Sequence, residues 1–255
     1  MILKDKVIII TGAATGLGKA FSLKCAAEGA KVVCADIADC QETGDLITKA
    51  GGDAICVYVD ISKSEAVDAM CKSAEEAFGG IDGIVNNASH NEKLEMRRFD
   101  EIDEAEWDKV MAVNAKGTWL CCKAAYPYMI KRGGGSMVNI SSALFLEGSP
   151  FLTHYLASKA AIWAMSRNIS RTAGEHCIRC NSVTLGFTMT ESVKKLQEDD
   201  PEKFQTVSGY ALSGRAIRRM EEPEDVVGGV TFLLSDESAF VTGQNLNIDG
   251  GCINY

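Results

Sequence analysis

The sequence predicts an α/β fold in which a parallel sheet of about seven strands lies between two layers of helices. Two observations lead to this fold class. Short apolar segments alternate with longer helix-like segments over most of the chain, and the strand-like segments are apolar almost without interruption. Strands that are apolar on both faces belong to a parallel sheet covered by helices on both sides. With right-handed crossovers, such a sheet is doubly wound and binds ligands at the carboxyl ends of its strands.

Each expected strand is a short run of β-branched or other apolar residues, and each expected helix is a longer segment. The third helix is expected to follow a capping box, Ser62–Glu65, and the last has Pro223 near its N-terminus. In chain order, we expect strands at 7–11, 31–36, 54–60, 83–87, 136–141, 178–185 and 246–249. We expect helices at 17–28, 41–50, 65–78, within 104–130, at 153–173 and at 223–234.

The chain is expected to form one domain over residues 1–255, because it has no internal repeat, low-complexity tract or linker. Its hydrophobic content of 46% and charged content of 24% are ordinary for a globular chain that buries a large core. Residues 187–213 have mixed polarity and no regular pattern, so we expect an irregular lid over the substrate there.

The net charge of −9 and the pI of about 5.0 argue against a nucleic-acid surface and against binding to anionic membranes. No segment has the length of a membrane span, and the apolar run Val7–Ile10 is too short for a signal peptide. The ten Cys are scattered, which favours free thiols in a reducing compartment, the cytoplasm. Cys177 and Cys180 have C-x-x-C spacing without a second Cys or His pair nearby, so we expect no metal.

A Gly-rich turn, Thr11–Gly18, joins the first strand to the first helix with the spacing G-x-x-x-G-x-G. Small residues there let backbone N–H groups and a helix N-terminus approach a pyrophosphate. Such a turn can also be a plain tight turn, but its place in a β–α–β unit predicts a Rossmann-like dinucleotide site. The residues expected to contact the cofactor from this turn are Gly12, Thr15, Gly16, Leu17 and Gly18.

Asp36 ends the second strand, where an acid can accept hydrogen bonds from both adenosine ribose hydroxyls and repels a 2′-phosphate. Neither the Gly-rich turn nor Ile37 supplies an Arg or Lys that would attract this phosphate. NAD is therefore preferred over NADP, although an Asp at the end of a surface strand is the structural alternative. Asp60 ends the third strand, where its side chain could meet the adenine, as could the backbone of Ile61.

Tyr155 and Lys159 lie four residues apart in the helix expected over 153–173, so both side chains project from the same face. A cation beside a phenol stabilises the phenolate and lowers its pKa. Lowering the pKa of Tyr from near 10 by two or three units takes roughly 3–4 kcal/mol, which a cation in a cleft can supply. We therefore expect Tyr155 to have a lowered pKa and to exchange a proton with a hydroxyl or carbonyl substrate. The structural alternative is a core Tyr beside a Lys that extends to solvent.

Together these features resemble the short-chain dehydrogenase/reductase family, and the resemblance covers nearly the whole chain. Each motif is weak alone, but they occur in the family's order. The motifs are the Gly-rich turn 11–18, Asn86-Asn87-Ala88, Asn114, Ser142, Tyr155 with Lys159, Thr190, and Asp249-Gly250-Gly251. The resemblance implies an oxidoreductase that binds a nicotinamide dinucleotide in a single Rossmann-fold domain.

The resemblance assigns catalytic roles to four residues. It implies that Tyr155 exchanges a proton with the substrate oxygen and that Ser142 hydrogen-bonds the same oxygen. It implies that Lys159 lowers the pKa of Tyr155 and holds the nicotinamide ribose, and that Asn114 holds a water linking Lys159 to solvent. Ser142 is preferred to Ser141 because its separation from Tyr155 in the sequence is the usual one in the family.

The resemblance also assigns residues to the nicotinamide end of the cofactor groove. It implies that Asn87 and the backbone of Ala88 line this groove. It implies that the segment Gly186–Thr190 holds the nicotinamide carboxamide through the Thr188 backbone and the Thr190 hydroxyl.

Two positions depart from the family pattern. Ser89 stands where the family usually has Gly, which removes a residue that adopts positive φ freely or adds a hydroxyl. Leu185 stands where the family usually has Pro, which removes a fixed φ and frees one N–H. Either change could shift the nicotinamide pocket, but neither removes a catalytic group.

The substrate is expected over the loops at the carboxyl ends of the fourth, fifth and sixth strands. The side chains there are largely apolar, with two His for which a structural role is the alternative. The candidate residues are His90, Leu144, His154, Phe187 and Met189. No Arg cluster stands out for a carboxylate or phosphate, although Arg97, Arg98 and Lys194-Lys195 are near enough to leave an anionic substrate open.

We expect an oxidoreductase that transfers a hydride between NAD(H) and a small secondary alcohol or ketone of apolar or aromatic character. One alternative is a 3-oxoacyl-(acyl-carrier-protein) reductase, but an acidic carrier calls for a basic rim and usually NADPH, so Asp36 and the acidic balance argue against it. Another is a dinucleotide-sensing regulator without turnover, against which the presence of Ser142, Tyr155 and Lys159 argues. The family usually pairs helices such as 104–130 and 153–173 between subunits, so a homotetramer or homodimer is expected.

Overall fold

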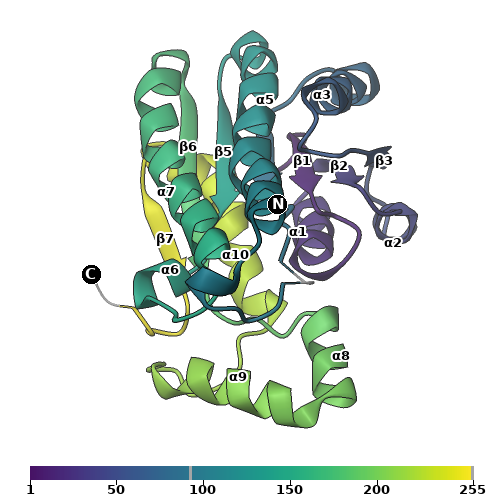
Figure 1. The fold of residues 1–255 in the computed structure, drawn as a ribbon. Coiled ribbons are helices and arrows are strands. Elements are labelled where there is room, and N and C mark those ends of the chain that lie inside the picture. Colours follow the sequence, from purple (N-terminus) through teal and green to yellow (C-terminus); the bar gives the residue numbers. More distant parts are fainter. Residues whose placement is uncertain (92–93, 254–255) are drawn as a thin grey trace.

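A single seven-stranded parallel sheet forms the centre of the computed structural model, which describes residues 1–91 and 94–253 (Figure 1). The strand order is β3-β2-β1-β4-β5-β6-β7. Strands β2 and β3 thus lie on one side of β1, and strands β4 to β7 lie on the other side. The strands are β1 Val7–Thr11, β2 Lys31–Asp36, β3 Ala54–Tyr58, β4 Gly83–Asn86, β5 Gly135–Ile140, β6 Ile178–Leu185 and β7 Asn245–Ile248. Every neighbouring pair is parallel, which confirms the predicted doubly wound fold.

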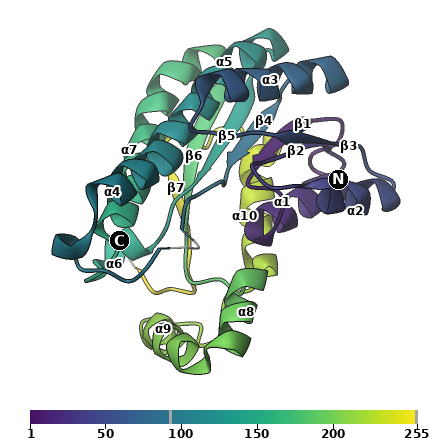
Figure 2. The ribbon, with the colours of Figure 1, turned by 45° about the vertical axis from the view of Figure 1, so that its right-hand side comes forward.

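Helices cover both faces of the sheet and make it a three-layer structure (Figures 1 and 2). Helices α1, α2 and α10 lie on one face, and α3, α5 and α7 lie on the other. The helices are α1 Gly16–Ala27, α2 Gln41–Lys49, α3 Ser64–Phe78, α4 Glu104–Val110, α5 Thr118–Arg132, α6 Leu144–Glu147, α7 Thr153–Ala173, α8 Glu191–Asp199, α9 Pro201–Ser213 and α10 Pro223–Leu234. A π-helix, Met111–Gly117, joins α4 to α5, and short 3₁₀ turns lie at Phe99–Glu101, Gly174–His176 and Asp236–Ser238.

Two hydrophobic clusters, one on each side of the sheet, hold the layers together. Successive residues of β1 contribute to opposite clusters: Ile8 and Ile10 belong to the one with α1 and α10, whereas Ile9 belongs to the one with α3 and α5. None of the three has exposed surface. Full burial of such a side chain contributes about 1.5–3 kcal/mol to the free energy of folding. Because helices cover both faces of the sheet, apolar residues are favoured at every position of these strands, and polar residues do not alternate with them.

Most predicted element boundaries agree with the structure to within two residues, and the predicted helical zone 104–130 is helical throughout. It is divided into α4, the π-helix and α5. The predicted capping box is wrong. The Ser62 hydroxyl donates to Asp60 Oδ1 at 2.7 Å, and α3 has Lys63 as its N-cap without a side-chain cap bond.

The predicted irregular lid folds instead into two helices, α8 and α9. Asp200 begins α9, because its carboxylate accepts the Lys203 N–H at 3.0 Å and Pro201 occupies the first turn. Both helices lie outside the three layers, at the end of the sheet where β5 leads to α6 and β6 leads to α8 (Figures 1 and 2). No helix among the described residues is both long enough and apolar enough to cross a bilayer.

Candidate active site

The Gly-rich turn lies at the carboxyl end of β1 and leads directly into α1. Gly12 and Gly16 have φ values of 70° and 56°, a region that Gly adopts without strain. A β-carbon on Gly18 would lie 1.8 Å from the Gly12 carbonyl oxygen, so no larger residue fits this turn. Thr15 is the exposed N-cap of α1, and Leu17 is half-buried in its first turn. The turn therefore presents the N–H groups of a helix N-terminus at the switch point of the sheet.

The loop after β4 is tied to this turn across the switch point. The Thr11 hydroxyl accepts the N–H of Asn87 at 3.0 Å and the N–H of Ala88 at 3.1 Å. The Asn87 amide donates back to the carbonyls of Thr11 and Gly12, at 3.1 and 3.3 Å. These contacts hold both sides of the predicted cofactor groove at a fixed separation.

Asp36 is held at the tip of β2 by two backbone N–H groups. Its carboxylate accepts from Ala14 at 2.8 Å and from Ala38 at 2.9 Å. A carboxylate with two further acceptor positions can still bind ribose hydroxyls. The remaining candidates on this side are Asp60, which binds the Ser62 N–H at 2.9 Å, the buried Ile61, and the exposed Ile37.

Tyr155 and Lys159 project from one face of α7, as the spacing predicted. Lys159 Nζ lies 5.6 Å from the centroid of the Tyr155 ring and donates to the Ile140 carbonyl at 3.0 Å. The side chain of Lys159 is almost fully buried, and Tyr155 is partly buried. The last carbonyl of β5 thus holds the ammonium at the carboxyl edge of the sheet.

The expected lowering of the Tyr155 pKa is wrong for this structure. Burial raises the pKa of the Tyr155 phenol to about 12, and the nearby Ser142 side chain only opposes the rise. Burial lowers the pKa of the Lys159 ammonium to about 8. Desolvation therefore dominates the pKa shifts of both groups, an effect that helical spacing alone does not reveal.

Two adjacent Ser residues follow β5, and only one of them faces the phenol. The Ser141 hydroxyl is buried and donates to the Lys159 carbonyl at 2.8 Å, which docks α7 on the sheet. The Ser142 side chain lies close enough to Tyr155 to lower the pKa of the phenol, and its hydroxyl accepts the Leu144 N–H at 3.2 Å. The geometry thus gives Ser141 a structural contact and places Ser142 beside Tyr155.

Asn114 lies in the middle of the π-helix, a rare conformation often found at functional sites. Its side chain is fully buried and bridges two parts of the site. Oδ1 accepts the His90 N–H at 2.7 Å, and Nδ2 donates to the Ser158 hydroxyl at 3.1 Å. Asn114 therefore fixes the loop after β4 against α7, and its role as a water holder stays a prediction.

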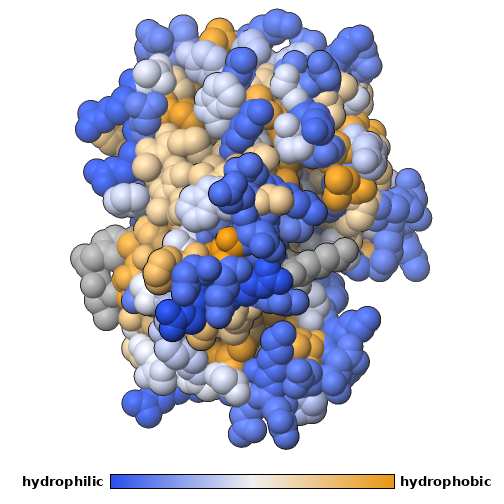
Figure 3. All heavy atoms as spheres, in the orientation of Figure 1, coloured by the Kyte–Doolittle hydropathy of each residue, from blue (hydrophilic) through white to orange (hydrophobic). Residues whose placement is uncertain are grey.

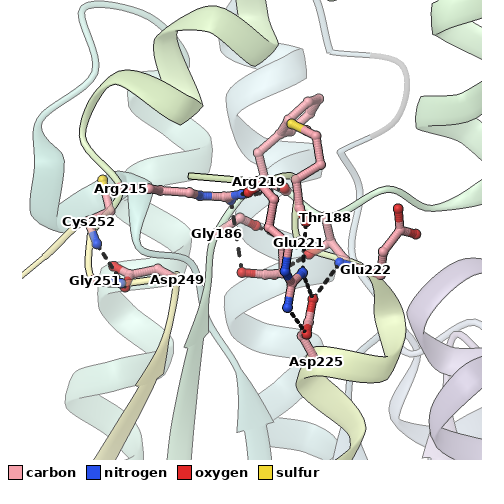
Figure 4. A network of polar contacts seen from close by, with 12 residues as sticks. Gly186, Thr188, Arg215, Arg219, Glu221, Glu222, Asp225, Asp249, Gly251 and Cys252 are labelled. Carbon is pink, nitrogen blue, oxygen red and sulfur yellow. Dashed lines mark hydrogen bonds and ion pairs between the residues drawn. The ribbon is translucent and has the colours of Figure 1, made fainter. Parts of the chain in front are cut away.

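The predicted nicotinamide segment, Gly186–Thr190, lies over a buried ion pair that the sequence analysis missed (Figure 4). Arg215 Nη2 donates to the Phe187 carbonyl at 3.0 Å and lies 3.9 Å from Glu221 Oε2. The Thr188 hydroxyl donates to the other oxygen of Glu221. A β-carbon on Gly186 would lie 2.6 Å from Arg215 Nη2, so the pair requires Gly at this position.

Three of the five substrate candidates, Leu144, Phe187 and Met189, come from α6 and from the segment after β6. Met189 is nearly buried, whereas Leu144 and Phe187 are half-exposed. His90 is held through its backbone by Asn114. These residues follow β4, β5 and β6, as the sequence predicted for the substrate end.

His154 does not line this surface, which corrects its predicted substrate contact. Its side chain has no exposed surface, and Nε2 lies 2.8 Å from Glu106 Oε1 of α4. Glu106 also lies 3.4 Å from Arg97 Nη1. The residue before Tyr155 therefore joins α7 to α4 inside the protein.

Most of the Arg and Lys residues considered as binders of an anionic substrate already form ion pairs with acidic residues. Arg97 pairs with Glu95 at 3.0 Å in addition to Glu106, and Arg98 pairs with Asp100 at 3.2 Å. Lys194 lies 3.5 Å from Glu222 Oε2. Apart from Lys195, the cations named for this rim therefore have acidic partners within the described chain.

Glu191, the first residue of α8, is a further site residue that the sequence did not reveal. Its Oε2 accepts the Gly16 N–H at 2.8 Å, although the two residues are far apart in the sequence. A carboxylate at the N-terminus of α1 shows that this end of the helix accepts an anion. Contacts of this kind depend on how α8 is placed, and no sequence motif signals them.

The chain is similar to known proteins over almost its whole length. A family model described as enoyl-(acyl carrier protein) reductase matches residues 12–253. A probable short-chain type dehydrogenase/reductase from Bradyrhizobium diazoefficiens is 43% identical over 99% of this chain and 89% of its own length. A 3-oxoacyl-[acyl-carrier-protein] reductase from Thermotoga maritima is 38% identical over 99% of this chain and 100% of its own length. The crystal structure of levodione reductase superposes with a TM-score of 0.90 at 28% identity, covering 97% of each chain.

The fold and the Ser-Tyr-Lys arrangement define an oxidoreductase built on a doubly wound sheet. The chain belongs to the short-chain dehydrogenase/reductase family. Members of this family use nicotinamide dinucleotides as cofactors.

Proposed function

We propose that this protein is an NAD(H)-dependent oxidoreductase that interconverts a secondary alcohol and a ketone of apolar or aromatic character. The observation that carries the proposal is the placement of three side chains at the carboxyl edge of the sheet. The Ser142 side chain lies near enough to Tyr155 to act on its pKa, and Lys159 projects from the same face of α7 as Tyr155. A phenol, a hydroxyl and an ammonium in this arrangement can bind a substrate oxygen and exchange its proton.

The residues at the switch point fit a dinucleotide. The Gly-rich turn has no room for a β-carbon at Gly18, and the Gly16 N–H already holds a carboxylate, which stands in for an anionic phosphate. Gly12, Gly16 and Gly18 would hold the pyrophosphate, and Lys159 would hold the nicotinamide ribose. When bound, the nicotinamide ring supplies the hydride chemistry.

NAD is the proposed cofactor because Asp36 is fixed where the adenosine ribose would lie. Two backbone N–H groups hold this carboxylate in place, so it cannot easily turn away from a 2′-phosphate. A fixed anion at the end of β2 repels that phosphate and accepts hydrogen bonds from ribose hydroxyls. The neighbouring Ile37 is exposed and offers no compensating positive charge.

The proton chemistry follows from the protonation states of Tyr155 and Lys159. With a pKa of about 12, the Tyr155 phenol keeps its proton near neutral pH and can donate it to a ketone oxygen. Ser142 would orient that oxygen by donating a second hydrogen bond. With a pKa of about 8, Lys159 is mainly charged near neutral pH and stabilises the phenolate that forms. The chain is thus prepared to act as an acid in ketone reduction.

A neutral, apolar substrate is favoured by the side chains at this end of the sheet. Leu144 and Phe187 offer apolar surface there, while Met189 is nearly buried. Arg97 and Arg98 are engaged by acidic partners and are not free to bind a substrate carboxylate. A small ketone or secondary alcohol therefore matches the site better than an anionic substrate does.

The test is to follow nicotinamide absorbance while a panel of ketones and secondary alcohols is offered with NAD(H) or NADP(H). Tyr155→Phe is expected to lower kcat by about 100-fold to 10,000-fold, because it removes the proton that is transferred. Its affinity for NADH, measured by fluorescence, should stay within about 2-fold, since the phenyl ring keeps its place. Tyr126→Phe on α5 serves as the control. Near-normal turnover by Tyr155→Phe would contradict the proposed role.

A second candidate is a 3-oxoacyl-thioester reductase, which is favoured by the 38% identical Thermotoga maritima reductase. The same panel separates the two candidates if it includes a 3-oxoacyl thioester with NADH and with NADPH. A kcat/KM at least about tenfold higher for the thioester than for every free ketone would establish this second function.

A further inference from the structure

The lid formed by α8 and α9 is fixed at its base by buried contacts between the segments that lead into it and out of it. Met189 N–H donates to the Glu221 carbonyl at 2.7 Å, and Thr188 pairs with Glu221 in a short parallel bridge. Arg215, which follows α9, donates to the Phe187 carbonyl. Figure 4 shows Thr188, Arg215 and Glu221 beside Gly186. Because both stem segments are held together, motion of the lid must occur beyond residue 189.

Beyond this stem, the first residue of α8 contacts the cofactor turn. Glu191 Oε2 accepts the Gly16 N–H at 2.8 Å, and the Thr190 methyl lies 3.5 Å from where a Gly16 β-carbon would be. Helix α1 has no acidic residue in its first turn, and its N-cap Thr15 makes no side-chain cap bond. Glu191 thus supplies the negative charge that the N-terminus of α1 otherwise lacks.

No cation among the described residues competes for Glu191. It forms no ion pair there, and Lys194, one turn further along α8, is paired with Glu222. The strongest partner of the carboxylate is therefore the N-terminus of α1. A pyrophosphate bound at the Gly-rich turn would need the same N–H and would repel the carboxylate.

We propose that Glu191 is an internal competitor of the cofactor pyrophosphate: its carboxylate holds α8 on the Gly-rich turn and must leave before a dinucleotide binds. This inference rests on the proposed cofactor. Glu191 thereby lowers the affinity for the dinucleotide and couples its entry to movement of the start of α8. The residue determines cofactor affinity without taking part in the chemistry.

The first experiment compares ligand binding by the full-length protein and two variants. Dissociation constants are measured by calorimetry for NADH, for ADP-ribose, which keeps the pyrophosphate, and for adenosine, which lacks it. Glu191→Gln is expected to bind NADH and ADP-ribose about 2-fold to 10-fold more tightly than wild type, because its neutral amide oxygen makes a weaker hydrogen bond to the Gly16 N–H than the charged carboxylate does. Its adenosine affinity should not change.

Glu198→Gln is the matched control, because Glu198 is an exposed acid on the same helix. It removes the same charge without removing a contact to the turn, so its affinities should equal those of wild type. Equal gains in both variants would reduce the effect to net charge and overturn the inference. Unchanged or weaker ADP-ribose binding by Glu191→Gln would overturn it as well.

The second experiment needs no ligand and separates this inference from the cofactor assignment. Amide hydrogen exchange of Gly16 and of the first turn of α8 is expected to be faster in Glu191→Gln than in wild type or in Glu198→Gln. Identical exchange in all three proteins would show that the carboxylate holds nothing in place. If exchange rises but neither NADH nor ADP-ribose binds any of the proteins, the contact exists and the proposed cofactor is wrong; competition with pyrophosphate is then overturned.

Discussion

At the scale of single residues, Lys159 and Tyr155 are ionisable groups within one turn of α7, and burial shifts their pKa values in opposite directions. The pKa of Lys159 falls from 10.5 to about 8, and that of Tyr155 rises from 10.0 to about 12. Each shift favours the neutral form, which is what desolvation does. Near neutral pH, the folded protein therefore carries a buried ammonium that it would be more stable without.

Replacing Lys159 by Met is expected to stabilise the protein near pH 7 and to abolish turnover. A pKa of about 8 against 10.5 corresponds to a cost of about 3 kcal/mol for charging the buried amine. Loss of the hydrogen bond to the Ile140 carbonyl offsets about 1 kcal/mol of this, so the net gain is about 2 kcal/mol. Urea unfolding of both proteins measures it.

The sign of this effect depends on pH. The folded pKa of Lys159 lies below the unfolded one, so the cost is fully present below about pH 8 and disappears as the pH rises toward 10.5. The advantage of Lys159→Met should therefore shrink between about pH 8 and pH 10. Lys72→Met, at an exposed position, should show no such trend. A stability difference that does not vary with pH would contradict the account.

The sequence could identify which residues gather at this edge of the sheet, but not their electrostatic state. The spacing of Tyr155 and Lys159 predicts that both side chains project from the same face of a helix, and the structure confirms this prediction. It carries no information on burial, which reverses the expected pKa shift of Tyr155. Likewise, the position of His154 after the fifth strand made it a substrate candidate, whereas its side chain lies against Glu106 in the structure.

At the scale of elements, the turn between β1 and α1 depends on close backbone approach, and its Gly residues are not equivalent to Gly elsewhere. Gly18 lies so near the Gly12 carbonyl oxygen that a β-carbon would overlap it. By contrast, Gly228 in α10 is exposed, and a β-carbon there would meet nothing within 4 Å. The same substitution should therefore have opposite effects at these two positions.

Gly18→Ala is expected to destabilise the protein by about 2 kcal/mol or more and to weaken NADH binding at least about tenfold, since the turn must open to relieve the overlap. Gly228→Ala should stabilise it by about 0.5–1 kcal/mol, because Ala loses less backbone entropy in a helix. Thermal unfolding and NADH titration of both variants check this. If the Gly18→Ala variant had the stability and NADH affinity of wild type, the turn would tolerate a side chain and this prediction would be wrong.

Elements with a strong apolar period were predictable, and the lid was not. Strands such as Val7–Thr11 consist of buried residues throughout, so their composition identifies them. Helix α8 has no buried residue and α9 has only Ser208, so neither helix places an apolar face in the core of the sheet. The pair Asp200-Pro201 is a helix start signal that could have located α9.

At the scale of the whole molecule, the helices α5 and α7 cover one face of the sheet and retain apolar surface on their outer side. Trp119 of α5 is 42% exposed and stacks with Lys123, whose Nζ lies 5.3 Å from its ring. Figure 3 shows a weakly hydrophobic area over α7, bordered by hydrophilic residues. Apolar surface of this kind on a helical layer favours packing against a second copy.

We propose that two copies pair through this layer, as a homodimer or as half of a homotetramer. Trp119→Glu should then lower the mass measured by light scattering at micromolar concentration, because replacing an aromatic side chain by a charge within the proposed interface costs about 2 kcal/mol or more. Tyr58→Glu replaces an aromatic residue that is 72% exposed at the far edge of the sheet, and it should leave the mass unchanged. A monomeric wild-type protein would refute the pairing. If Trp119→Glu left the measured mass unchanged, the subunits would pair through another face of the molecule, and the proposed contact through α5 would be wrong.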